Sequence, residues 1–287
     1  MNRRQYLGTA GTAFTTAALA GCVGSGNEGE DGVFVETAVN ETALDVEFPE
    51  DSSIRQVNLL QDGELVNQAS LQAGEYRTSI QLVQHDDTQI QGIYPPGDLT
   101  LVATDDAGEE YEHEQTIEPA MEIADVRVPD DDFQRLLVEV ENTGNGPGAL
   151  ARLGVLGEEL HEGFPLEDDA AGANFLQHPA DESPWFDSHP LSARESIDIV
   201  PPDPVLGFVA ITSYEPDPEP HWYDDPETLA DELGGETIAV DVPILTATHN
   251  LTASVDVLLA GDVVERGRMH YFTEAQVDDI ETSTKAL

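Results

Sequence analysis

Apolar and polar residues alternate in short runs from Val33 to Pro119, and turn residues separate these runs. Alternation with period two is typical of an antiparallel strand that buries one face. About seven strands fit this segment, which predicts an immunoglobulin-like or fibronectin-like β-sandwich. The clearest runs are Leu44 to Phe48, Leu99 to Ala103 and Tyr111 to Ile117, and the clearest hairpin turns are Asp62-Gly63 and Asp105 to Gly108.

A second unit with the same kind of alternation runs from Ala120 to about Ile280. One short helix is expected through Leu233, because Asp225 suits its cap, Pro226 its first turn and Gly234 its end. The expected strands are residues 121–128, 136–142, 197–200, 205–212, 238–242 and 251–259. The sequence therefore predicts an all-β fold of two tandem Ig-like antiparallel β-sandwiches, residues 33–119 and 120–280, before a disordered tail at 281–287.

The two units meet at Pro119 without a flexible linker, which predicts rigid tandem domains, and they show no convincing internal repeat. In the second unit, the strand that ends at Asn142 leads into the Gly-rich segment Thr143 to Gly148. This strand and turn resemble the CARDB-type adhesion-related sandwiches of surface proteins. No helix pattern follows the glycines, so a hairpin is expected there and not a dinucleotide-binding turn.

The first thirty residues have the pattern of a targeting segment and not of a folded domain. Arg3-Arg4-Gln5-Tyr6-Leu7-Gly8 resembles the twin-arginine export motif, and Leu19-Ala20-Gly21-Cys22 resembles a lipobox. The resemblance implies a signal peptide at 1–21 and a lipid on Cys22, which in archaea is a two-chain diether. Residues 22–32 then form a lipidated, Gly-rich tether. A short membrane anchor or a cytosolic start is the alternative, although the apolar run is short and polar for a span.

Acidic residues dominate the chain, with 58 Asp and Glu against 11 Lys and Arg, and Lys285 is the only lysine. Near 1 M salt the Debye length is about 3 Å, so neighbouring carboxylates repel each other weakly. The composition therefore predicts a protein of a halophile, adapted to high salt. An acidic face for a basic partner or for divalent cations is the alternative. Nucleic acid binding is excluded, because the chain cannot supply a basic patch.

Common catalytic motifs are absent from the sequence. A phosphate-binding loop would need a lysine after its glycines, and the only lysine, Lys285, lies in the expected tail. A zincin helix would need a second histidine after His113-Glu114 or His161-Glu162, and none follows at that spacing. No G-x-S-x-G segment occurs. Cys22 is the only cysteine and is assigned to the lipid, which excludes both a disulfide and a blue-copper site. The acidic clusters lack the spacing of an EF-hand. The sequence therefore predicts neither an enzyme nor a bound cofactor.

Two segments without strand alternation, Gly157 to Pro190 and Tyr214 to Pro226, are the candidates for a binding site, because long loops in compact domains are usually functional or disordered. Each contains aromatic residues beside a histidine and a carboxylate. If the loops meet at one end of the sandwich, they form a site for zinc or another transition metal. Stacking on a sugar and a simple plug of aromatics beside solvated histidines are the alternatives. The candidate residues are His178, His189, His221, Asp187, Asp224, Trp185 and Trp222.

Asn40 and Asn250 begin Asn-x-Thr sequences and are candidates for N-glycosylation. Together these patterns predict a lipoprotein on the outer face of the cell membrane, held by its lipid. The expected role is a non-enzymatic binding or structural module that contacts an envelope protein or glycan. The alternative is a lipoprotein that binds a solute or a divalent metal through the loops at 157–190 and 214–226.

Overall fold

The computed structural model describes residues 32–85, 90–129, 133–157, 160, 189–201, 205–210, 222–223, 225–266 and 269–286. Antiparallel strands make up nearly all of the regular structure there, together with one short helix. No helix in this part of the chain is both long and apolar enough to cross a membrane. The predicted all-β sandwich class is confirmed.

The first sandwich packs a three-stranded sheet against a four-stranded sheet. Its strands are β1 (Glu36–Asn40), β2 (Ala43–Glu47), β3 (Ile54–Gln61), β4 (Glu64–Ser70), β5 (Arg77–Gln81), β6 (Val83–His85), β7 (Ile90–Ile93), β8 (Gly97–Asp105) and β9 (Glu110–Ile117). The sheet orders are β1-β2-β5 and β4-β3-β8-β9, and β6 pairs with β7 alone. Leu44 and Val46 of β2 and Leu99 and Leu101 of β8 are buried in one core, as their alternation predicts.

Both hairpin turns predicted in the first sandwich are present. Asp62 and Gly63 join β3 to β4 with φ angles of 50° and 80°, and Gly108 lies between β8 and β9 with φ 84°. Glycine adopts this left-handed conformation without the steric cost that a Cβ brings, and aspartate tolerates it better than most residues. Local turn chemistry therefore fixes these two registers.

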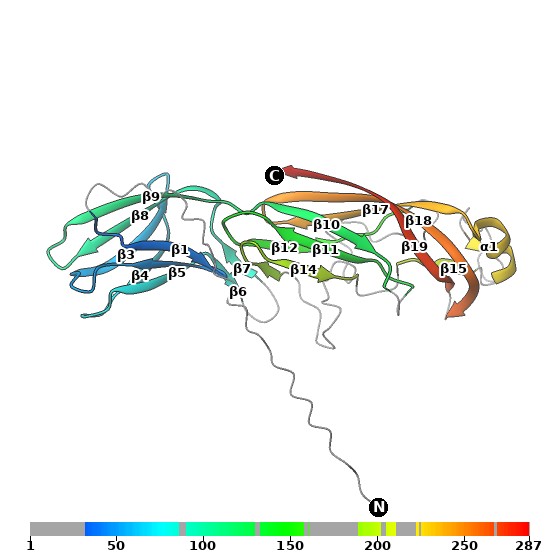
Figure 1. Ribbon diagram of the computed structural model, residues 1–287, viewed down its shortest axis with the longest axis horizontal. Helices are drawn as coiled ribbons and strands as arrows, with labels where there is room; N and C mark the ends of the chain where they lie inside the picture. Colours follow the sequence, from blue (N-terminus) through cyan, green and yellow to red (C-terminus); the bar gives the residue numbers. More distant parts are fainter. Residues whose placement is uncertain are drawn as a thin grey trace, which may run out of the picture.

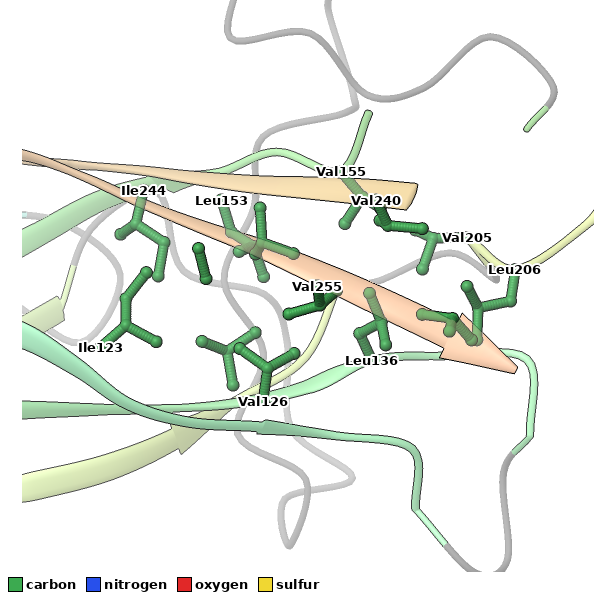
Figure 2. Packing of buried hydrophobic residues seen from close by; sticks show 14 of the residues in the cluster. Ile123, Val126, Leu136, Leu153, Val155, Val205, Leu206, Val240, Ile244 and Val255 are labelled. Atoms are coloured by element: carbon green, nitrogen blue, oxygen red, sulfur yellow. The ribbon is translucent and has the colours of Figure 1, made fainter. Parts of the chain in front are cut away.

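The second sandwich packs a three-stranded sheet against a seven-stranded sheet. Its elements are β10 (Met121–Arg127), β11 (Leu137–Asn142), β12 (Gly148–Leu153), β13 (His189–Leu191), β14 (Ser196–Ile199), β15 (Phe208–Ala210), β16 (Trp222–Tyr223), α1 (Pro226–Leu233), β17 (Thr237–Thr246), β18 (His249–Arg266) and β19 (Met269–Ala286). The sheet orders are β10-β11-β14 and β13-β12-β17-β18-β19-β15-β16. Figure 2 shows how Ile123 and Val126 of β10 face Val240, Ile244 and Val255 of the larger sheet.

The strand order of the second sandwich repeats that of the first. The sheet β10-β11-β14 corresponds to β1-β2-β5, and β13-β12-β17-β18 corresponds to β4-β3-β8-β9. Both sandwiches insert extra elements between the fifth and sixth strands of this shared framework, β6 and β7 in the first and β15, β16 and α1 in the second, and the second also adds β19 after the framework. The two sandwiches lie end to end (Figure 1).

A long hairpin of β18 and β19 forms the middle of the second sandwich. Each strand has 18 residues, which corresponds to a length of roughly 60 Å. β19 pairs with β18 as far as Ala286, opposite His249. The predicted disordered tail at 281–287 is therefore wrong for residues 281–286, because backbone pairing with β18 orders them although their side chains are polar.

Helix α1 begins and ends where its capping residues predict. The Asp225 side chain accepts a hydrogen bond from Thr228 N at 2.8 Å, Pro226 occupies the first turn and Gly234 follows Leu233. Leu229 is fully buried in the core of the second sandwich. The helix therefore covers one end of that core.

The Gly-rich turn after β11 is not a hairpin, because β11 and β12 belong to different sheets. It instead packs on the segment that joins the two sandwiches. Asn145 donates from Nδ2 to Thr116 O and accepts at Oδ1 from Glu118 N, both at 2.8 Å. A Cβ on Gly146 would lie 2.1 Å from Tyr94 Oη of the first sandwich. The turn therefore forms the junction between the sandwiches, and glycine is needed there for close approach.

Candidate functional site at the distal end of the second sandwich

Two of the candidate ligand residues, His189 and Trp222, lie among the described residues. His189 begins β13 and is opposite Leu150 of β12, and Trp222 begins β16 and is opposite Val209 of β15. These strands are the two outer edges of the seven-stranded sheet. The other five candidates, His178, His221, Asp187, Asp224 and Trp185, lie outside the described residues, as do Arg3, Arg4 and Cys22.

His189 and Trp222 also lie at opposite ends of the β18–β19 hairpin. His189 pairs through Leu150 with Thr246, which lies close to the start of β18. Trp222 pairs through Val209 with Met269, which lies at the far end of the hairpin. The distance along β18 between these rows is on the order of 50 Å. A site that contains both residues is therefore not formed, because the chain between them crosses the whole sandwich.

The end that contains Trp222 is the distal end of the molecule, farthest from the junction. We define the distal end by the described residues Phe133 to Leu136, Val205 to Ala210, Trp222 and Tyr223, Asp225, Glu265 and Arg266, and Met269 to Tyr271. It comprises the short parallel pair β15–β16, the start of α1 and the tip of the β18–β19 hairpin (Figure 1). Short strands beside a helix start make this the least regular part of the described sheet.

His270 is the most unusual side chain at the distal end. It is directly opposite Phe208 in β15, and only 2% of its surface is exposed. Neither Nδ1 nor Nε2 has a hydrogen-bond partner in the described part of the chain. Because buried polar groups in folded proteins nearly always have partners, such a histidine indicates a position where another group completes the hydrogen bonding.

Asp225 brings a carboxylate close to this histidine. The hydrogen bond from the Thr228 amide lowers the pKa of Asp225, and the charge of His270 acts in the same direction. The carboxylate is exposed, whereas the imidazole is buried. The distal end therefore combines an exposed carboxylate with a buried imidazole.

Arg266 adds a cation to the same end. The Gln134 side-chain oxygen, in the amide orientation that satisfies both residues, accepts hydrogen bonds from Arg266 Nε at 3.2 Å and from Nη1. The Arg266 guanidinium lies 5.4 Å from the centre of the Phe133 ring, within the range of a cation–π contact. No carboxylate in the described part of the chain pairs with Arg266. In the described part of the chain, an amide and an aromatic ring therefore hold the Arg266 guanidinium.

Close packing holds these strands in place. A Cβ on Gly207 would lie 2.8 Å from Met269 Cε and from Tyr271 Cε1. The rings of Phe208 and Phe272 contact each other edge to face, 5.9 Å apart. The distal end therefore contains a tightly packed group of aromatic side chains.

Sequence reasoning missed both His270 and Arg266. Neither residue lies in the two long loops, and Met269-His270-Tyr271-Phe272 has no clear alternation of apolar and polar residues. The aromatic residues beside His270 are the one signal that it lies against a core. The lack of hydrogen-bond partners for its ring nitrogens could not be predicted, because it depends on which residues the fold brings near them.

Metal binding gains no support from the described residues, among which no group of three or more His, Cys, Asp or Glu side chains could hold an ion. On the outer face of β1-β2-β5, Glu36, Asp45 and Glu47 line a depression of about 400 Å³. Arg77 lies there 2.9 Å from Glu47, and this hydrogen-bonded pair raises the pKa of Arg77. One of the three carboxylates is thus already neutralised by an arginine.

The two candidate glycosylation residues are both exposed but lie in different surroundings. Asn40 ends β1 beside the tight turn to β2 and donates to Asp45 Oδ2 at 3.2 Å. Asn250 lies within β18, between Leu245 of β17 and Lys285 of β19. Modification of either asparagine stays a prediction.

Comparison with known proteins assigns this chain to no family. No family model matches it, and no curated protein matches it. Among solved structures, a mutant of Salmonella alpha-2-macroglobulin is similar over 87% of this chain at 8% identity, with a TM-score of 0.19. The chain spans 21% of the length of that protein. Likeness at this level carries no argument about function.

Proposed function

We propose that this chain is a non-enzymatic lipoprotein of a halophilic archaeon, held at the outer face of the membrane through Cys22. Its role is to present the distal end of the second sandwich to a protein or glycan of the cell envelope. The observation that carries the proposal is the layout of the chain, in which the start of the folded part and the distal end lie at opposite ends of the molecule.

The position of β1 supports this layout. Tyr94 lies against Gly146 at the junction and donates from its amide to Leu82 O, and Leu82 in turn donates to Thr42 O in the β1–β2 turn. The β1–β2 turn is therefore at the junction, and Glu36, at the other end of β1, lies away from it. A tether that enters at Glu36 leaves the length of both sandwiches between the membrane and the distal end.

The chemistry of the distal end supports binding rather than catalysis. The one imidazole among its described residues, His270, is only 2% exposed, which leaves it little access to a substrate. Arg266 instead offers a cation above an aromatic ring, and His270 offers two ring nitrogens without partners among the described residues. Envelope glycans and acidic surface proteins of a halophile present matching acceptors.

Membrane fractionation tests the anchor. In the native host, Cys22→Ser is expected to move the protein from the membrane fraction to the medium and to leave its leader uncut, because the lipid is attached at this sulfur. Ser25→Ala in the tether is the matched control and keeps the protein at the membrane. Equal membrane retention and processing of the Cys22→Ser variant would refute the anchor.

Binding to isolated envelopes tests the distal end. Arg266→Ala is expected to weaken binding of the purified protein at high salt, whereas Arg55→Ala, in the first sandwich, leaves it unchanged. Arg55 is a suitable control because it is a surface arginine whose ion pair with Asp106 spans 3.8 Å. If both variants bind like the parent protein, the distal end is not the contact surface.

A second candidate function is the binding of a solute at the distal end, which the missing partners of His270 favour, or of a metal ion by the histidines of the two loops. Elemental analysis of the protein purified at high salt, with and without His270→Ala, tests it. The same measurement on a variant with His178, His189 and His221 replaced by alanine covers the histidines of the two loops. A stoichiometric metal that is lost in either variant would replace the non-enzymatic proposal with this one.

A further inference from the structure

The second half of β19 is an edge strand. On one side it pairs with β18 along its whole length, and on the other side it pairs with β15 only at Met269 and His270. From Thr273 to Ala286, its outer edge has no strand partner among the described residues. An edge of this kind presents unpaired backbone N–H and C=O groups, which can pair with another strand.

Most of this edge is protected against pairing. A bulge at Asp278 interrupts the ladder, because Asp279 is opposite Asp256 and Val277 is opposite Val257. Glu274 and Asp279 add negative charge on either side of the bulge. Bulges and charges are the usual means by which proteins block edge strands.

The last stretch of the strand, Ile280 to Ala286, lies beyond the bulge. Residues 281–285 are all exposed, and Figure 1 places this end of β19 at the outer rim of the second sandwich. Neither Glu281 nor Lys285 has an ion pair or a side-chain hydrogen bond with another described residue. Residues 281–285 therefore form an open edge that carries one acid and one base without an ion pair among the described residues.

We propose that two copies of the chain pair antiparallel along this edge, with the two-fold axis at Ser283. In this register, Glu281 of one copy is opposite Lys285 of the other, and the same pair forms again on the other side of the axis. The two charges lie four residues apart on one face of the strand, so the segment is complementary to itself.

The remaining pairs also suit this register. Ser283 meets its own copy, and its small side chain lets the strands approach at the axis. Thr282 is opposite Thr284 on the other face, and β-branched residues and threonine pairs are favourable cross-strand neighbours. A two-fold contact of this type closes on itself and gives a dimer, not a fibre.

The charge of the protein sets the conditions for pairing. Two copies repel each other in dilute buffer, but at molar salt this repulsion is screened beyond about 3 Å. The ion pair between Glu281 of one copy and Lys285 of the other acts at short range, so it still favours the proposed strand register at molar salt. One strand pair buries little surface, so covalent trapping is the suitable measurement.

Disulfide trapping tests the proposal on the full chain with Cys22→Ser, so that the introduced thiol is the only one. Ser283→Cys is expected to form a disulfide-linked dimer on mild oxidation at high salt. Thr282→Cys is not expected to do so, since it lies opposite Thr284. Efficient trapping through Thr282→Cys and not through Ser283→Cys would refute this register, and absence of trapping at both positions would refute the dimer.

A charge exchange tests the role of the ion pairs. Added to Ser283→Cys, Lys285→Glu places like charges opposite each other and is expected to reduce the trapped dimer by about fivefold. Adding Glu281→Lys to that variant restores the opposite charges and is expected to restore the dimer. Circular dichroism checks that each variant is folded. In the Thr282→Cys background, rescue of trapping by Asp279→Lys in place of Glu281→Lys would show that the strands pair two residues out of the proposed register and would overturn it.

Discussion

The two sandwiches share one framework of seven strands but use it differently. In the first, the insertion between the fifth and sixth strands is the small hairpin β6–β7, beside the junction. In the second, the insertion at the same point supplies β15, β16 and α1, which widen the sheet and build the distal end. A strand added after the framework, β19, connects this insertion to the rest of the sheet.

This difference indicates a division of roles along the molecule. The first sandwich is a nearly bare framework, which suits a spacer. The second carries its additions at the end away from the junction, where they are accessible to a partner. Insertions between framework strands are a common way to place binding groups on a rigid scaffold.

Removal of salt is expected to have the largest effect and to act on both sandwiches alike. Residues 33–119 contain 19 acidic and two basic residues, and residues 120–287 contain 36 and seven. Lowering the salt from about 1 M to 0.01 M lengthens the Debye length from about 3 to about 30 Å, so repulsion spreads over each domain. Circular dichroism during dialysis is expected to show loss of the β-sheet signal. A cooperative fold that persists in dilute buffer would contradict the adaptation to high salt.

Truncation of a core phenylalanine is expected to destabilise only the sandwich that contains it. Phe48 is buried in the first core and Phe208 in the second, and the two cores are distinct clusters. Each Phe→Ala variant is expected to lose about 3–5 kcal/mol of unfolding free energy. In thermal unfolding at high salt, each should lower the transition of its own sandwich. If both variants lower one common transition, the sandwiches unfold as a single unit.

A change at the junction is expected to have a smaller effect. Asn145→Ala removes the hydrogen bonds to Thr116 O and Glu118 N, which is expected to cost about 0.5–1.5 kcal/mol because both bonds are exposed and water replaces the amide. The angle between the sandwiches should become variable, and small-angle scattering would detect this as a change in the radius of gyration. Asn58→Ala is the control, since the Asn58 side chain accepts a hydrogen bond from Gln56 of the same strand, β3. An unchanged scattering profile for Asn145→Ala would show that other contacts hold the junction.

The smallest effect is expected at the cap of α1. The pKa of Asp225 is lowered in the folded state, so the cap stabilises the helix at pH values above the ordinary aspartate pKa of 3.8. This stabilisation is lost as the pH falls through the lowered folded-state value. The protection factors of the α1 amides against hydrogen exchange should therefore fall in acid. Asp225→Asn keeps a capping oxygen without the titration, and an equal acid response in that variant would assign the effect to another group.

Local patterns predicted much of the fold because they depend on near neighbours. Period two in β2, β8 and β18 reports which face of a strand is buried, and the Asp225, Pro226 and Gly234 pattern places α1 correctly. The candidate site was less accessible to such reasoning. Similar segments around His189 and Trp222 suggested one site, but alternation does not say which strands are neighbours in a sheet.

The amino-acid sequence by itself determined the all-β class, the positions of most strands and turns, the acidic surface and the export and lipid motifs that stand as predictions. Only the tertiary structure decided that the two sandwiches repeat one strand order, that the turn around Asn145 forms the junction, and that His270 is buried without a partner. The reason is that strand order and burial result from contacts between residues far apart in the chain. A residue such as Ser283 looks like part of a disordered tail until its partner, Thr252, is known.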